Sequence, residues 1–514
     1  TNPRGGVTQH SYRLYGSGST MTPQHLLESR IGPATEAGSQ EVWYNYDGAM
    51  RLISERRKDT LGRWVTTGYT YDPETGFLEA VVQHGEGVHA RTEYKHNDFG
   101  QVVRQIDPDG VVTGKAYGWG GELVSEFVLA EGADPNAPDE ELMLVSQTRY
   151  EYDEDGRLET VARALDEGSF LYDYPDDWVA TRYAYDSRGR KRAVIEDWDE
   201  AGLRANLQTS YEYDEQGRLR QTTYPTGRWV RTTRDGRGLV TLEEVGYGED
   251  PAEVVVYTTG YEYDANGNLI EQVNPDGTVL VHRYDNFDRL RKTYQYSTSG
   301  PWTYREYDAA GAVVLEQAFE ADGTPLQDRR RVYDVAGRPT LERTTASPGA
   351  LADANDLITT YGYDVAGNVR WVIAKGVGSS DPNGMIEPND VVTEHRYDAL
   401  GRKIATIDPE GIWTTFAYSP GGRLLTVVDP NIPDPNPIFV TVHAYDAAGR
   451  RARTTNPEGD YTRTFYNSLN QVIREVVWDC NSTVDYTPDD VPVRQVRYAY
   501  DRLGRRTREA VMKD

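Results

Sequence analysis

Short runs of alternating polar and apolar residues dominate the chain, and turn-forming residues close each run after a few positions. The Tyr-Glu-Tyr run from Tyr150 to Tyr152 places both rings on one side of an extended strand, because strand side chains alternate with a period of two. Gly or Pro interrupts almost every longer window, and no segment keeps the 3.6-residue period of an amphipathic helix. The pattern therefore predicts an all-β protein with minimal helix.

One motif recurs along the chain: aromatic-x-Tyr-Asp-x-x-Gly-Arg-Leu. There are about 18 copies, spaced 21 to 35 residues apart. Clear copies have their Tyr at Tyr152, Tyr213, Tyr263, Tyr333, Tyr363, Tyr397, Tyr445 and Tyr500. Weaker copies lie at Tyr46, Tyr71, Tyr185, Tyr284, Tyr307, Tyr418 and Tyr466, and degenerate ones put His96, Tyr117 and Arg234 in the Tyr place.

Each copy reads as a hairpin turn. The Asp carboxylate is suited to accept backbone N–H groups just after it, and the Gly three positions later supplies a left-handed conformation. This is a type I turn followed by a left-handed residue, which joins two antiparallel strands. Asn470 and Asp288 replace this Gly and tolerate that conformation, whereas Met50 in the same place does not fit. The predicted structural residues of five clear copies are Tyr152, Asp153, Gly156, Tyr213, Asp214, Gly217, Tyr263, Asp264, Gly267, Tyr363, Asp364, Gly367, Tyr445, Asp446 and Gly449.

A second type of turn links the hairpins. Pro-x-Gly stands between hairpins at 108–110, 225–227, 275–277, 409–411 and 457–459. At these five places the next Tyr position lies seven residues after the Gly and 21 residues after the previous Tyr position. The basal unit is therefore strand, Asp-Gly turn, strand, Pro-Gly turn. Longer units enlarge the second turn with loops rich in Pro, Asp, Asn and Gly: 131–141, 165–178, 347–356, 376–390, 429–437 and 479–491.

These units predict one long antiparallel meander. Its Tyr-Asp turns fall along one edge and its enlarged loops along the other, with roughly 36 strands from about 18 hairpins. Aromatic residues two positions before the Tyr would form cross-strand ladders. Because open twisted sheets rarely exceed about ten strands without curling, we expect a spiral or a hollow barrel-like shell. A β-propeller is the alternative, but it requires a regular period of 40-odd residues. We assign residues 1–40 to an N-terminal linker or degenerate repeat and 41–514 to the continuous array.

Composition narrows the function. Asp and Glu number 82 against 55 Lys and Arg, a formal charge of −27, which disfavours nucleic acid and anionic membranes as partners. The single cysteine excludes an internal disulfide, and no run of 18 apolar residues predicts a membrane span. The chain starts at Thr1 without Met or a signal peptide, so we expect a processed product or a fragment.

The Tyr-Asp-x-x-Gly-Arg units, with intervening Asp-Pro-x-Gly segments such as 107–110 and 408–411, resemble the RHS or YD-repeat family over roughly residues 40 to 510. The resemblance implies a β-sheet spiral that closes into a hollow cocoon. In bacterial insecticidal toxin complexes and Rhs toxins the cocoon encloses a toxic C-terminal domain, and in teneurins a related shell serves cell adhesion. The toxin branch ends in a self-cleaving Asp-Pro-x-Gly-Leu segment, which nothing here matches.

Candidate chemistry is sparse. His282, His395, His443 and His96 occupy repeat-aromatic positions and read as ring substitutes, while His84 and His89 with His96 form a weak metal candidate. The repeated turn Asp residues read as turn caps rather than a catalytic pair. Acidic loops give weak calcium candidates at Asp134, Asp353 and Asp381. Tryptophans in or beside loops, the candidate glycan contacts, are Trp119, Trp178, Trp198, Trp302 and Trp478.

We therefore expect a structural shell segment without catalytic residues or a required cofactor, belonging to a large secreted or cell-surface bacterial protein. Its expected partners are flanking segments of a longer chain, an enclosed cargo or toxin domain, or homotypic end-to-end contacts between edge strands. The alternative is an adhesion or carbohydrate-binding module that acts through the loops of one sheet edge.

Overall fold

A computed structural model describes residues 2, 4–15, 24–35, 38–59, 61–129, 144–164, 178–198, 205–248, 254–296, 300–345, 356–376, 389–429, 439–479, 491–501 and 503–512. Within these ranges the regular structure is β-strand throughout, and no helix occurs there that is long and apolar enough to cross a membrane. The minimal helix expected from the sequence pattern is confirmed for this part of the chain.

The strands have the following bounds. The first half comprises β1 (Gln9–Tyr15), β2 (Gln24–Ile31), β3 (Glu41–Tyr46), β4 (Leu52–Lys58), β5 (Trp64–Tyr71), β6 (Leu78–Gly85), β7 (Val88–His96), β8 (Val102–Ile106), β9 (Val112–Tyr117), β10 (Leu123–Leu129), β11 (Leu144–Tyr152), β12 (Leu158–Ala164), β13 (Trp178–Tyr185), β14 (Lys191–Glu196), β15 (Leu207–Tyr213), β16 (Leu219–Thr223), β17 (Arg228–Arg234), β18 (Val240–Tyr247) and β19 (Val254–Tyr263). The second half comprises β20 (Leu269–Val273), β21 (Val279–Tyr284), β22 (Leu290–Gln295), β23 (Trp302–Tyr307), β24 (Val313–Phe319), β25 (Pro325–Tyr333), β26 (Pro339–Thr344), β27 (Leu357–Tyr363), β28 (Val369–Ala374), β29 (Val391–Tyr397), β30 (Lys403–Ile407), β31 (Trp413–Tyr418), β32 (Leu424–Asp429), β33 (Phe439–Tyr445), β34 (Arg451–Thr455), β35 (Tyr461–Tyr466), β36 (Val472–Asp479), β37 (Val491–Tyr500) and β38 (Arg506–Met512).

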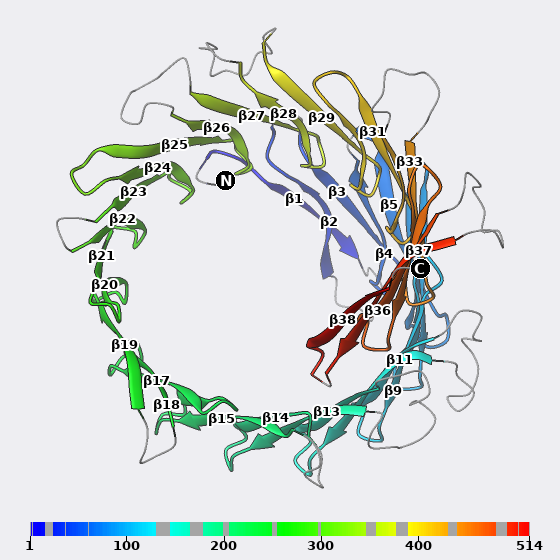
Figure 1. Ribbon diagram of the computed structural model, residues 1–514. Helices are drawn as coiled ribbons and strands as arrows, with labels where there is room; N and C mark the ends of the chain where they lie inside the picture. Colours follow the sequence, from blue (N-terminus) through cyan, green and yellow to red (C-terminus); the bar gives the residue numbers. More distant parts are fainter. Residues whose placement is uncertain are drawn as a thin grey trace. The chain divides into compact units, whose positions relative to one another are not determined.

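The strands pair in chain order as one antiparallel sheet, with 38 strands in the described residues (Figure 1). From β3 onward, every odd strand ends at a Tyr position of the repeat and turns into the next even strand. All Tyr-Asp turns therefore share one edge of the sheet, the Tyr-Asp edge, and the other turns share the opposite loop edge. The predicted all-β meander is confirmed, while its winding into a shell stays a prediction.

A β-bulge follows almost every Tyr-Asp turn. In the β11–β12 pair, for example, Glu151 faces Thr160 but Tyr152 faces Leu158, so Glu159 is an extra residue on the even strand. The same shift occurs at Tyr185, Tyr213, Tyr263 and other repeat tyrosines. A bulge increases local twist and leaves one backbone position outside the regular ladder.

Most side chains of this sheet remain partly accessible to solvent. Buried apolar side chains form only small clusters in the described residues, such as Val65 with Val88 and Ala399, and Leu129 with Phe127. Stability must therefore come mainly from contacts between neighbouring hairpins and between sheet edges.

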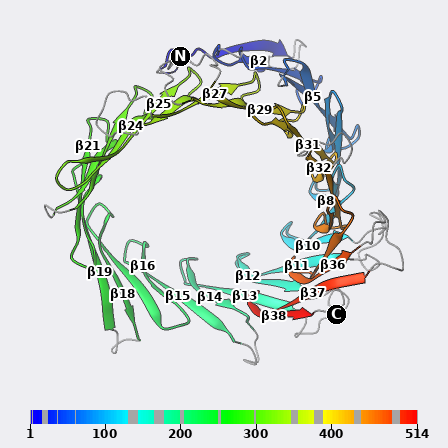
Figure 2. The ribbon, with the colours of Figure 1, turned by 45° about the horizontal axis from the view of Figure 1, so that its top comes forward.

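The chain divides into two compact units. Unit 1 comprises Thr1–Arg13, Leu27–Val42 and Gln208–His395, and unit 2 comprises Leu14–Leu26, Trp43–Leu207 and Arg396–Asp514. Each unit thus combines an early and a late stretch of the sheet. In unit 2, the early strands in blue and cyan run beside the late strands in orange and red (Figure 2).

Candidate functional site

The Tyr-Asp turn has one repeated geometry. In the turn at Asp153, the carboxylate Oδ1 accepts the backbone N–H of Asp155 at 3.1 Å and of Arg157 at 2.9 Å, and Gly156 has φ 75°. Two backbone bonds close the turn, Arg157 O accepting from Asp153 N and Asp153 O accepting from Gly156 N. The turns at Asp214, Asp264, Asp364 and Asp446 repeat the carboxylate bond to the fourth residue, and Gly217, Gly267, Gly367 and Gly449 have φ of 84°, 93°, 94° and 76°.

Residues other than Gly also take the left-handed position. Asn470 has φ 62° and Asp288 has φ 58°, as their substitution pattern predicts. Met50, which the sequence leaves unexplained, has φ 65°, and its N–H still donates to Asp47 O at 3.0 Å. The turn therefore imposes its backbone conformation even on a side chain that is poorly suited to it.

The arginine of the motif connects each hairpin to the next. Arg289 Nε donates to its own turn carboxylate, Asp285, at 2.8 Å, and Arg289 Nη1 donates to Asp308 O of the following turn at 2.9 Å. Its guanidinium also lies 4.8 Å from the ring centre of Tyr307, the next repeat tyrosine. The same guanidinium-on-tyrosine contact occurs for Arg51, Arg157, Arg338, Arg402, Arg423 and Arg450.

The tyrosine hydroxyl completes this connection. Tyr284 OH donates to Leu269 O at 2.9 Å, and Leu269 faces Tyr263 in the preceding hairpin, directly beside the extra bulge residue Ile270. Because the bulge disturbs the ladder at this carbonyl, the hydroxyl supplies it with a donor. The bond recurs from Tyr71, Tyr117, Tyr152, Tyr185, Tyr307, Tyr333, Tyr363, Tyr418, Tyr445, Tyr466 and Tyr500. The sequence shows that the Tyr and the Arg recur, but it does not predict the hydroxyl bond or the guanidinium contacts, because both reach into a neighbouring hairpin.

The turn environment perturbs the acids and bases in it. The side-chain bond from Arg289 lowers the pKa of Asp285 to about 2, and the bond from Arg190 lowers the pKa of Asp186. Burial raises the pKa of Tyr284 and lowers the pKa of His282 and His443. The Nδ1 atoms of these two histidines contact Thr293 Oγ1 at 3.0 Å and Thr454 Oγ1 at 3.1 Å on the neighbouring strands. His282 and His443 therefore pack against the neighbouring strand like other side chains of the sheet.

The five candidate tryptophans differ in environment. Trp119 is fully exposed at the tip of the β9–β10 turn. Trp178 is buried in β13 beneath Arg149, and Arg182 lies over Trp198. Trp302 and Trp478 are strand residues that stack on Phe319 and Tyr461. Trp119 is therefore the candidate whose ring is open to a ligand.

Several predicted features lie outside the described residues or are not brought together. Asp134, Asp353 and Asp381, and most of the enlarged loops, fall outside the described ranges. His84 and His89 meet across one hairpin, but His96 lies at the other end of β7, where its ring contacts Phe77 at a tilt of 41°. The described residues contain no group of three potential metal ligands.

A clamp in unit 2 joins the loop edge of early strands to the Tyr-Asp edge of late ones. The β8–β9 turn presents Asp109, whose side chain is 7% exposed. Its carboxylate accepts from Ser419 Oγ at 2.8 Å, from Gly421 N at 2.7 Å and from Arg423 Nη1 at 2.5 Å. Arg423 Nη2 also donates to Asp107 at 2.8 Å. Residues more than 300 positions apart are thus tied by charge-assisted bonds.

Edge-to-edge contact occurs at other places within each unit. In unit 2, Ser468 Oγ donates to Ala164 O at 2.8 Å, and Ala399 packs so closely on Gly85 that a Cβ there would lie 2.3 Å from the Ala399 Cβ. In unit 1, Arg4 Nη2 pairs with Asp308 at 2.6 Å, and Asn2 Nδ2 donates to Val335 O at 2.5 Å. In each case the late partner is a Tyr-Asp turn.

The turn tips carry a sequence signal for this contact that sequence analysis missed. The two middle residues of turns before Asp308 are mostly polar, charged or exposed aromatic, as in Glu154-Asp155, Ser187-Arg188 and Glu215-Gln216. From Asp308 onward they are mostly small or apolar, as in Ala309-Ala310, Val335-Ala336, Val365-Ala366 and Ala399-Leu400. The change falls where the described turns begin to pack on a loop edge.

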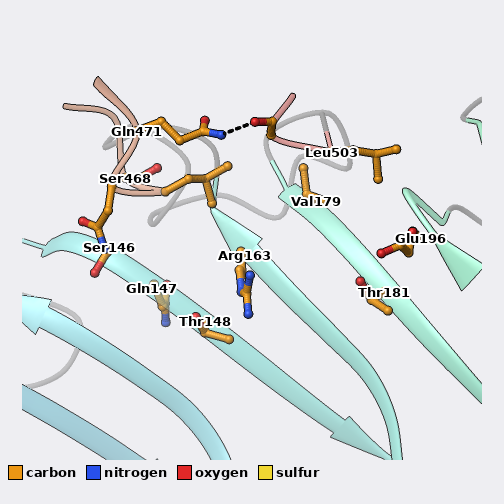
Figure 3. Close-up of a pocket in the computed structure, with 13 residues that line it drawn as sticks. Ser146, Gln147, Thr148, Arg163, Val179, Thr181, Glu196, Ser468, Gln471 and Leu503 are labelled. Atoms are coloured by element: carbon orange, nitrogen blue, oxygen red, sulfur yellow. Dashed lines mark hydrogen bonds between the residues drawn. The ribbon is translucent and has the colours of Figure 1, made fainter. Parts of the chain in front are cut away.

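A polar cavity lies at one of these edges in unit 2 (Figure 3). It has a volume of about 370 Å³, and strands β11 to β14 line one side with residues that include Arg163 and Glu196. The turn residues Ser468–Gln471 and Leu503–Gly504 line the other, where Gln471 Nε2 donates to Gly504 O at 3.0 Å. None of the residues that line the cavity is a nucleophile hydrogen-bonded to a base, and we interpret the cavity as a gap between two sheet edges.

The geometry defines an all-β repeat protein whose hairpins are linked in series by Tyr, Asp and Arg. Residues 263–300 match the RHS Repeat family. These residues therefore carry an RHS repeat, and the same sequence motif recurs from Tyr46 to Tyr500.

Similar solved structures belong to toxin complexes. A crystal structure of TcdB2-TccC3 aligns with a TM-score of 0.42 and 13% identity over 98% of this chain and 31% of that chain. A Photorhabdus luminescens Tc holotoxin pore aligns with a TM-score of 0.39 and 12% identity over 98% of this chain and 32% of that chain. The chain thus spans about a third of the length of these structures. A search of curated proteins gave no match.

Proposed function

We propose that this chain is a non-enzymatic wall segment of a large secreted or cell-surface bacterial RHS-repeat protein, and that the wall encloses a cargo or toxin domain. The observation that carries the proposal is the edge-to-edge contact, of which the Asp109–Arg423 clamp is the strongest case. A sheet whose two turn edges bond to each other forms a continuous wall. The named toxin-complex structures support the same type of role.

Small-angle scattering and electron microscopy of the purified chain test the wall. A compact protein of 514 residues has a radius of gyration of about 24 Å. A curved single-layer wall gives a larger radius and a region of low density on its concave side. A radius near the compact value, with a filled particle in class averages, would reject the proposal.

Limited proteolysis of the full-length polypeptide that contains these residues tests enclosure. We expect a flanking domain to be cut more slowly than the same domain expressed alone. Asp109→Ala should accelerate the cut by opening the wall, whereas Asp276→Ala, in a similar but exposed Pro-Asp-Gly turn, should not. Equal cutting rates in the intact protein and the free domain would show that the domain lies outside.

Glycan adhesion is the second candidate, and two exposed rings favour it. Phe99 is 88% exposed at the tip of the β7–β8 turn, next to fully exposed Trp119 on the β9–β10 turn. The two tips are separated by two strand spacings, about 9.6 Å, which suits a glycan that stacks alternate sugars on the rings. Glycan-array binding that Trp119→Ala abolishes and Phe287→Ala preserves would support adhesion; binding that survives Trp119→Ala would reject this surface.

A further inference from the structure

Two histidines face each other at the end of the β6–β7 hairpin in unit 2. His84 and His89 are register partners, and a two-residue turn, Glu86-Gly87, joins their strands. Their Nδ1 atoms lie 3.0 Å apart, and their ring centres are 4.6 Å apart. Both side chains are exposed, so the pair is open to solutes.

The separation of the two Nδ1 atoms suits the coordination of one metal ion by both rings. Two neutral rings at this distance share one N–H, with one Nδ1 as the donor and the other Nδ1 as the acceptor. When the donor ring takes the tautomer with its proton on Nε2, both Nδ1 lone pairs become free to bind one metal ion. The pair therefore presents a preformed bidentate nitrogen ligand on a rigid hairpin, and this limits the entropy lost on binding.

The nitrogen separation also selects the coordination geometry. With metal–nitrogen bonds of about 2.1 Å, two nitrogens at a right angle lie about 3.0 Å apart, and two at the tetrahedral angle lie about 3.4 Å apart. The observed 3.0 Å matches the right angle. Right angles between nitrogens are the preference of tetragonal Cu²⁺ and Ni²⁺, whereas Zn²⁺ prefers the tetrahedron.

We propose that His84 and His89 form a two-imidazole site for a tetragonal divalent metal, with Cu²⁺ bound most tightly, Ni²⁺ next and Zn²⁺ least. Water fills the other equatorial positions, since the nearby Glu86 carboxylate is ion-paired with Arg63. The proposal is independent of cargo enclosure and of glycan binding.

The site lies beside an edge contact, and this gives metal binding a structural consequence. Gly85, between His84 and the turn, packs on Ala399, and Val88, next to His89, is buried with Val65 and Ala399. A metal that joins the two strands at this point holds the hairpin end against the Ala399 turn. Metal binding should therefore slow amide exchange both in the hairpin and in residues 398–402.

Electron paramagnetic resonance of the full 514-residue chain with one equivalent of Cu²⁺ tests the site. We expect an axial signal with hyperfine coupling to two nitrogens, which His84→Ala and His89→Gln each remove. His282→Ala is the matched control, because its ring is partly buried against Thr293, and this variant should keep the signal.

Titration calorimetry and hydrogen exchange complete the test. The wild type should bind Cu²⁺, Ni²⁺ and Zn²⁺ in that order of decreasing affinity, and Cu²⁺ should slow exchange in residues 80–92 and 398–402. Circular dichroism of each variant checks that it is folded. A two-nitrogen signal retained in folded His84→Ala, one that His282→Ala also loses, or Zn²⁺ binding tighter than Cu²⁺ would overturn the proposal.

Discussion

Replacing Asp109 by alanine should open the edge contact of unit 2 without unfolding the sheet. The substitution removes the acceptor of three bonds, from Ser419 Oγ, Gly421 N and Arg423 Nη1. Breaking a buried ion pair by truncating one partner costs about 3–5 kcal/mol. Arg423 keeps Asp107 as a partner and is 21% exposed, so we expect a smaller cost of about 2–3 kcal/mol.

Hydrogen exchange measures this cost locally, which suits a repeat array that opens in parts. A cost of 2–3 kcal/mol raises the open population roughly 30- to 150-fold, so amides of residues 418–424 should exchange faster by that factor. Asp276→Ala is the control, because Asp276 caps an equivalent turn through Thr278 N at 2.8 Å and is exposed. If residues 418–424 exchange at the wild-type rate in Asp109→Ala, or accelerate equally in Asp276→Ala, the clamp does not hold the edges together.

Four further changes test single features of the fold. Tyr284→Phe removes the bond to Leu269 O and should lower the free energy of unfolding of that hairpin by about 1 kcal/mol, whereas Tyr296→Phe, at a 72% exposed ring, should change it little in a denaturant titration. Gly85→Ala forces a Cβ against Ala399 and should destabilise this edge contact by about 1–3 kcal/mol. Gly236→Ala is the control, because no atom lies within 4 Å of the added Cβ. Amide hydrogen exchange at residues 398–402 should be faster in Gly85→Ala alone. Met50→Gly relieves the left-handed strain at φ 65° and should raise the melting temperature, with a gain of up to about 1 kcal/mol; a lower melting temperature would show that the side chain contributes more than the strain costs. The free energy of unfolding should first fall as the pH drops below 6.5, because the folded pKa values of His282 and His443 are lowered and the unfolded chain accepts these protons more readily. It should fall again between pH 3.8 and about 2, as Asp285 protonates. Loss of the first step in the double variant His282→Gln/His443→Gln would confirm that these two histidines cause it.

The sequence alone predicts the local structure of this protein well. Each hairpin specifies its own turn through an Asp that caps and a residue that accepts a left-handed conformation, so even Asn470 and Asp288 could be placed correctly. The short turns fix the antiparallel order, and the period of two in the strands fixes their register, because a slip of one residue would move every side chain to the other face. These features depend on neighbours in the sequence and are therefore visible in it.

The links between hairpins could not be predicted in the same way. The bond from Tyr284 to Leu269 lies beside the bulge at Ile270, and the arginine contacts depend on the spacing between adjacent turns. The motif shows that Tyr and Arg recur and predicts aromatic ladders between strands, but it does not show which atoms of the next hairpin these side chains contact. Their partners belong to the neighbouring hairpin, and only the paired register of the strands reveals them.

The edge contacts depend on a still longer range of the chain. Their partners are 333 residues apart for Asn2 and Val335, 312 for Asp109 and Gly421, and 304 for Ala164 and Ser468. This separation is set by the number of strands and the length of the loops between the partners, so no single repeat contains it. Inserting or deleting one 21-residue unit would bring Asp109 opposite a different turn tip, where the Ser-Pro-Gly-Gly-Arg sequence that binds its carboxylate is not present. The change from polar to small apolar turn tips after Asp308 is therefore informative, because it marks in the sequence itself where the late turns begin to meet an early edge.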